Sequence, residues 1–175
     1  MKAKNKSLLY NIVGIAGCFL LIVIDQLTKI LVVENLKDRE PFILIKGVFE
    51  LQYLENRGAA FGILENQKIF FIISGVIILA GIGYVYTRIP DSRKYMPLRI
   101  VSILMAAGAV GNMIDRIRNS YVIDFLYFKL IDFPIFNVAD CYVTIAAGLL
   151  MVLFLFIYKE SDLDFISLKK DRNDD

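Results

Sequence analysis

Four aspartates lie within or beside long apolar stretches of this sequence, where charged side chains are uncommon: Asp25, Asp115, Asp124 and Asp140. An ionisable side chain costs at least ~2.5–3.5 kcal/mol to place in a bilayer, so each is a candidate functional residue. Two carboxyl groups held close together in a low dielectric keep one proton between them. The charged member of such a pair can activate water, and the neutral member can protonate a carbonyl oxygen or a leaving amine.

The composition removes several other kinds of chemistry. The chain has no histidine, which excludes His-dependent triads, the HExxH metal site and most catalytic zinc sites. Cys18 and Cys141 lie in apolar stretches and are expected to be separate thiols. We therefore expect no metal and no cofactor. The net charge of +2 also gives no basic field of the kind that binds nucleic acid.

The elements that must position these aspartates are helices long enough to cross a membrane. Apolar residues make up 57% of the chain and gather in four blocks, and a spanning helix needs about 20 such residues. We predict an all-α membrane protein formed by a single domain over residues 1–175, with four transmembrane helices. The spans are expected at about 8–33, 69–87, 98–115 and 137–158.

A small β-rich extracytoplasmic segment, residues 34–68, is predicted between spans one and two. Apolar and polar residues alternate from Phe49 to Leu54, which indicates a strand, and Asn56-Arg57-Gly58 supplies a turn. Lysine and arginine gather in the N-terminal flank, the link around Arg88–Arg99 and the tail 159–175, which predicts that both termini are cytoplasmic. The polar residues of the spans then fall near the outer leaflet.

A lipobox-like run, Ile15-Ala16-Gly17-Cys18, follows the basic N-terminus. A cleaved lipoprotein signal peptide would end there, but the apolar run continues for six further residues, Phe19–Ile24. We therefore interpret the whole stretch as the first membrane span.

Spacing alone leaves the function open among three classes. Asn112 and Arg116 at i, i+4, and Asn137 and Asp140 at i, i+3, could simply join helices by hydrogen bonds in a structural protein. The same carboxylates could serve protons or cations in a small transporter or channel subunit. A peptidase is the third class, and no particular pair of aspartates can be chosen on this basis.

Five motifs resemble those of the lipoprotein signal peptidase (signal peptidase II) family, in the same order along most of the chain. They are Asp25-Gln26-Leu27-Thr28-Lys29, Asn56-Arg57-Gly58-Ala59-Ala60-Phe61-Gly62, Gly111-Asn112-Met113-Ile114-Asp115-Arg116, Val122-Ile123-Asp124-Phe125 and Phe136-Asn137-Val138-Ala139-Asp140. The sequence departs from the usual family residues at Ala107, Phe133 and Cys141, none of which is a member of the polar set.

The resemblance implies an intramembrane aspartic endopeptidase with Asp124 and Asp140 as its catalytic dyad. Its substrates would be diacylglyceryl-modified prolipoproteins, cut before the lipidated cysteine. The enzyme would lie in the bacterial cytoplasmic membrane among membrane lipids as a monomer, with its active site near the outer leaflet. The residues implied to bind substrate or shape the site are Asp25, Lys29, Asn56, Gly58, Asn112, Asp115, Arg116 and Asn137.

Physical reasoning then suggests individual roles. Asn137 lies one turn from Asp140 and can orient a carboxylate or the substrate carbonyl. Arg116 is expected to pair with Asp115 and so to fix the loop that carries Asp124. Gly58 is expected to permit a turn or a close approach of the backbone to a ligand, with an apolar ledge over 59–61 facing a lipid-bearing substrate. The two dyad carboxyls are expected to lie close enough to share a water.

Overall fold

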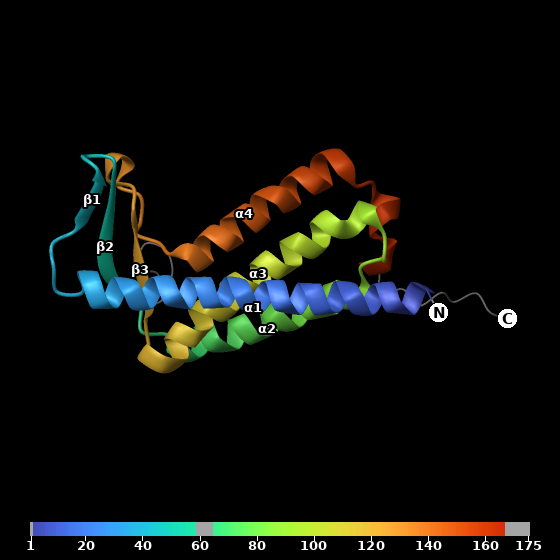
Figure 1. The fold of residues 1–175 in the computed structure, drawn as a ribbon, viewed down its shortest axis with the longest axis horizontal. Coiled ribbons are helices and arrows are strands. Elements are labelled where there is room, and N and C mark those ends of the chain that lie inside the picture. Colours follow the sequence, from blue (N-terminus) through green and yellow to red (C-terminus); the bar gives the residue numbers. More distant parts are fainter. Residues whose placement is uncertain (1, 59–64, 167–175) are drawn as a thin grey trace.

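The computed structural model describes residues 2–58 and 65–166, with side chains from Leu8 onward. The long helices are α1 (Lys2–Leu36), α2 (Lys68–Arg88), α3 (Met96–Asn119) and α4 (Val138–Val152), which continues as a π-helical segment over Leu153–Ile157. The strands β1 (Phe42–Ile45), β2 (Phe49–Asn56) and β3 (Val122–Tyr127) form a sheet at one end of the helices (Figure 1). Short 3₁₀ segments cover Arg93–Tyr95, Lys129–Ile131 and Glu160–Ile166.

The helices are long and apolar enough to cross a membrane, as predicted. The candidate spans are Leu8–Leu36, Lys68–Arg88, Arg93–Asn119 and Val138–Ile157. Large apolar side chains face outward along them, and α2 contains no buried residue at all. Because water would penalise such a surface, these faces are explained by contact with lipid. The third span reaches Asn119, about one turn beyond its predicted end, so Asp115 and Arg116 both lie on helix.

The helix α3 packs against each of the other three long helices. Gly108 allows its close approach to α4, because a Cβ at this position would lie 2.6 Å from the carbonyl oxygen of Ala139. Any larger residue would push the two helices apart. This contact fixes the first turns of α4 beside α3.

The sheet is antiparallel in the order β1-β2-β3. The predicted β-rich segment between the first two spans is confirmed for β1 and β2. The third strand comes from the link between α3 and α4, which the sequence did not predict to be a strand. Its register places Leu54 opposite Asp124 and Asn56 opposite Val122, so Asn56 is the diagonal neighbour of Asp124.

Candidate active site

Polar side chains from the helices and the sheet meet where the sheet joins the helical bundle. The group comprises Asp25 and Lys29 from α1, Asn56 from the end of β2, Asn112 and Asp115 from α3, Asp124 from β3, and Asn137 and Asp140 from the start of α4. Asp25, Lys29, Asp115, Asp124 and Asn137 are buried. Residues more than a hundred positions apart therefore form one connected network.

Lys29 is the buried cation at the base of this network. Its Nζ lies 3.0 Å from Asp25 Oδ2 and 2.9 Å from Asp115 Oδ2, and it donates to Asn112 Oδ1 at 3.0 Å. Three acceptors thus match the three donors of the ammonium group. A buried charge of this kind is tolerated because it is both paired and fully hydrogen-bonded.

The two carboxylates that bind Lys29 also hold the backbone of neighbouring elements. Asp25 Oδ1 accepts the N–H of Ala139 at 2.9 Å, and Asp115 Oδ2 accepts the N–H of Ile123 at 3.2 Å. These two backbone groups immediately precede Asp140 and Asp124, respectively. The ion cluster therefore fixes the chain directly next to each of these aspartates.

Asp124 is held by two side-chain amides. Asn56 Nδ2 donates to its Oδ2 at 2.8 Å, and Asn137 Nδ2 donates to its Oδ1 at 2.6 Å. The pKa of Asp124 is raised to about 7, first by burial and then by the nearby charge of Asp140. The two amide hydrogen bonds and the charge of Lys29 oppose this shift.

Asp140 lies in the first turn of α4, where Asn137 is the N-cap. The Asn137 side chain accepts from the N–H of Asp140, and Asp140 Oδ2 accepts from the N–H of Asn137, which together form a capping box. The other oxygen, Oδ1, accepts from Asn112 Nδ2 at 2.8 Å. Asn137 also donates to Asn112, so the two amides connect Asp124 to Asp140.

A family model described as signal peptidase (SPase) II matches residues 17–156. The chain belongs to the signal peptidase II family. It is a peptidase and a multi-pass membrane protein. Of the three classes that spacing left open, family membership selects the peptidase over the transporter and the structural protein.

Curated relatives of this family align with most of the chain. The lipoprotein signal peptidase of Symbiobacterium thermophilum is 45% identical over 141 residues, which are 79% of this chain and 91% of that protein. The lipoprotein signal peptidase of Clostridioides difficile is 41% identical over 143 residues, covering 81% and 94%. The resemblance found in the motifs is thereby confirmed.

Two solved bacterial membrane enzymes share the fold. One, determined by the in meso method at 2.3 Å resolution, superimposes with a TM-score of 0.72 at 29% identity and covers 90% of this chain and 93% of its own. The other, determined at 1.9 Å, has a TM-score of 0.71 at 30% identity and covers 83% and 94%. The four helices and the small sheet are therefore the architecture of known membrane enzymes.

In this signal peptidase II family member, one predicted contact is wrong. Asp115 pairs with Lys29 and not with Arg116. Arg116 instead donates to the carbonyl of Gly58 at 3.1 Å, and its guanidinium lies 4.4 Å from the ring centroid of Phe71. Arg116 therefore fixes the backbone at Gly58, just after β2 ends. The predicted ledge at residues 59–61 lies outside the described residues.

Gly58 is held in a turn, as its sequence context predicts, because its N–H donates to Asn56 Oδ1 at 2.9 Å. Sequence reasoning missed Gln26 as a member of the site. Its Nε2 donates to Asp25 and Asp115 at 3.1 and 3.0 Å, so it links the same two carboxylates as Lys29. The available signal was an amide directly beside Asp25 in the first motif. Among the residues that the structure describes, no group of three or more acidic or cysteine side chains could hold a metal ion.

Proposed function

We propose that Asp124 and Asp140 are the catalytic pair of an aspartic endopeptidase that removes signal peptides from lipid-modified prolipoproteins. The observation that carries the proposal is the division of the aspartates into two kinds. Asp25 and Asp115 are both paired with Lys29. Within residues 8–58 and 65–166, neither Asp124 nor Asp140 forms an ion pair, and the amides of Asn112 and Asn137 connect them.

This arrangement supports metal-free hydrolysis of a peptide bond. Because burial and mutual repulsion disfavour two negative charges, the dyad keeps one proton until the pH rises through about 7, where the pKa of Asp124 lies. The charged carboxylate takes a proton from a water molecule while the oxygen of that water forms a bond to the scissile carbonyl carbon. At the same time the protonated carboxyl donates its proton to the carbonyl oxygen. When the C–N bond breaks, the newly protonated carboxyl donates its proton to the leaving amine, and the other carboxylate takes a proton from a hydroxyl of the tetrahedral intermediate, so the dyad again holds one proton.

The Lys29 cluster supports this chemistry by positioning. Asp25 and Asp115 each bind the backbone N–H immediately before a dyad member. A shift of either segment by about 1 Å can cost on the order of a hundredfold in rate. We therefore assign Asp25, Lys29 and Asp115 to positioning and Asp124 and Asp140 to catalysis.

The proposed substrate is a bacterial prolipoprotein carrying diacylglyceryl-cysteine, cut just before that cysteine. Curated relatives are named lipoprotein signal peptidases, and the residues of the polar network lie toward one end of the spans. Each buried CH₂ contributes about 0.8 kcal/mol, so two acyl chains hold the modified cysteine at a fixed depth. The exposed apolar strand β1, at the edge of the sheet, is suited to lie at the same interface.

We further propose that the chain is a single peptidase domain with both termini in the cytoplasm and the dyad near the outer leaflet. The basic link at Arg88–Arg99 supports this orientation. An impermeant thiol reagent added to intact cells should label Ser120→Cys but not Arg93→Cys, above the background set by Cys18 and Cys141. The reverse pattern would overturn the orientation.

The substrate proposal is tested with the purified chain and two synthetic prolipoprotein peptides that differ only in the diacylglyceryl group. Mass spectrometry should find cleavage of the lipidated peptide at the bond before the modified cysteine, and little cleavage of the other. Equal rates on both peptides would contradict the positioning by lipid and favour a broader peptidase. Cleavage at a different bond would contradict the assigned specificity.

A further inference from the structure

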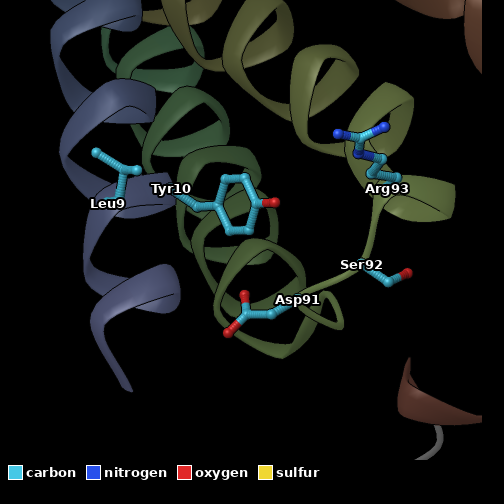
Figure 2. Close-up of a pocket in the computed structure, with 5 residues that line it drawn as sticks. All are labelled: Leu9, Tyr10, Asp91, Ser92 and Arg93. Atoms are coloured by element: carbon cyan, nitrogen blue, oxygen red, sulfur yellow. The ribbon is translucent and has the colours of Figure 1, made fainter. Parts of the chain in front are cut away.

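A cavity of about 400 Å³ lies at the end of the bundle opposite the sheet. Leu9 and Tyr10 of α1 line it together with Asp91, Ser92 and Arg93 of the link between α2 and α3. Figure 2 shows Tyr10 and Asp91 on facing sides, with Ser92 and Arg93 following along the link. Leu9 and Tyr10 begin the first span, and Arg93 begins the third. The cavity therefore lies at the depth of lipid headgroups.

A buried arginine with unused hydrogen-bond donors supports the wall of this cavity. Arg99 is 4% exposed, and its Nη2 donates to the carbonyl of Ile89 and to Asp91 Oδ1, each at 2.7 Å. Its Nε and Nη1 have no hydrogen-bond partner within the described chain. The guanidinium carbon lies 5.2 Å from the ring centroid of Tyr10 and 5.1 Å from that of Tyr86. The cavity wall is therefore backed by a buried guanidinium that holds Asp91 and the link in place.

The charged side chains around the cavity would attract an anion and would not repel it. The only carboxylate among the lining residues, Asp91, is already neutralised by Arg99. The neighbouring Lys94 is paired with Asp162 of the C-terminal 3₁₀ segment. Arg93 is exposed and forms no ion pair with any residue that the structure describes. One guanidinium and the hydroxyl of Ser92 are thus available at the cavity.

The opposite wall of the cavity is apolar and continues along the membrane-facing side of α1. Leu9, Ile12 and Val13 are 59%, 55% and 59% exposed. The wall is held against α2 by a hydrogen bond from Tyr86 Oη to the carbonyl of Tyr10 at 3.1 Å. Gly14 permits this contact, since a Cβ there would collide with the Tyr86 hydroxyl. The cavity thus joins a fixed polar end to a surface suited to an acyl chain.

We propose that this cavity binds the phosphate of an anionic glycerophospholipid from the leaflet opposite the aspartates. Arg93 and Ser92 contact the phosphate, Arg99 neutralises Asp91 so that this carboxylate does not repel the phosphate, and the acyl chain lies along Leu9 and Ile12. A soluble anion would gain nothing from the apolar wall, so the shape and the charge together favour a lipid. Each basic residue near an anionic membrane surface raises lipid affinity by about fivefold.

Native mass spectrometry of the full chain, released from nanodiscs containing both phosphatidylglycerol and phosphatidylcholine, tests this site. The unsubstituted chain should retain phosphatidylglycerol in preference to phosphatidylcholine. Arg93→Gln should reduce the retained phosphatidylglycerol by about fivefold. The control Arg118→Gln, which removes an exposed arginine at the far end of α3, should retain as much as the unsubstituted chain.

Two further measurements distinguish a phospholipid from free inorganic phosphate as the bound anion. Leu9→Gln should weaken retention of the phospholipid, while an excess of inorganic phosphate should fail to displace it. Displacement by inorganic phosphate would overturn the lipid and indicate a free anion site. Equal retention by Arg93→Gln and Arg118→Gln would overturn the site itself. Peptide cleavage in detergent should not change with Arg93→Gln, so this test is independent of the proposed function.

Discussion

Two buried cations lie at opposite ends of the helical bundle, and their surroundings differ. Lys29, beside the sheet, is bound by two carboxylates and one amide oxygen. Arg99, at the other end, binds one carboxylate and one carbonyl and otherwise faces the rings of Tyr10 and Tyr86. Hydrogen bonds fix direction closely, whereas a ring face attracts a cation over a broad range of positions. The difference indicates that the sheet end is built for exact placement and the other end for adaptable packing.

Among the changes that compare the two ends, removing the cation at the sheet end should have the largest effect. Lys29→Met leaves Asp25 and Asp115 buried without their partner, which should cost about 3–5 kcal/mol of stability. Because both carboxylates hold the backbone next to the dyad, kcat/KM should fall by about a hundredfold or more. Thermal unfolding in detergent and a lipopeptide cleavage assay measure the two effects. The control Lys46→Met, in the exposed β1–β2 turn, should change neither. If Lys29→Met kept full activity, the positioning role would be wrong.

The pH dependence of cleavage reports the charge state of the same end. Burial and the charge of Asp140 hold the pKa of Asp124 at about 7, so the native dyad keeps a proton that an exposed aspartate would lose near pH 4. As the pH rises through 7 the general acid is lost, and kcat/KM should fall by about tenfold per further pH unit. A rate profile that stays flat above pH 7 would contradict this assignment.

A smaller effect should follow from crowding the Lys29 cluster without removing a charge. A Cβ at Gly111 would lie 2.6 Å from Asp25 Oδ2, whose position is fixed by Lys29. Gly111→Ala should therefore reduce kcat/KM by about tenfold. Gly83→Ala in α2 meets nothing within 4 Å and is the matched control. Because alanine favours helix, this control should keep activity and not lose stability. Equal activity of the two variants would show that the cluster tolerates displacement.

The smallest effect on catalysis is expected at the opposite end. Arg99→Met keeps an apolar stem between Tyr10 and Tyr86 and releases Asp91, which is partly exposed to solvent. The free energy of unfolding should decrease by about 1–2 kcal/mol, and kcat/KM should stay within about twofold of that of the unsubstituted chain. A loss of activity as large as that of Lys29→Met would remove the contrast between the two ends.

Much of the fold and the membership of the site could be predicted from the sequence. Four apolar blocks of about 20 residues leave few alternatives, because a block of that length satisfies its own backbone within a bilayer as a helix, whereas a barrel strand spans the bilayer in about 10 residues. The ends of these blocks then place Asp25, Asn112, Asp124 and Asp140 at a similar depth. The five motifs added the identity of the family, which the comparisons confirm.

The pairing of charges could not be predicted, since it depends on helix length and rotation. Asp115 and Arg116 are neighbours in sequence, but on a helix successive side chains point about 100° apart. Because α3 continues to Asn119, Asp115 faces Lys29 of α1 while Arg116 reaches the carbonyl of Gly58. The burial of Arg99 could not be predicted either, because a basic residue at the edge of a span ordinarily faces the lipid headgroups.

We propose that Asp124 and Asp140, and not the other aspartates near them, carry out the chemistry. The most direct measurement is the cleavage rate of a lipidated prolipoprotein peptide by Asp124→Asn and by Asp140→Asn, with Asp132→Asn as the control. Asp132 is exposed and is bound only by the hydroxyl of Tyr127 among the described side chains. Each dyad variant should be slower by about 10²–10⁴-fold while remaining folded, and the control should match the unsubstituted chain. If either dyad variant cleaved the peptide at the control rate, the aspartic mechanism would be contradicted.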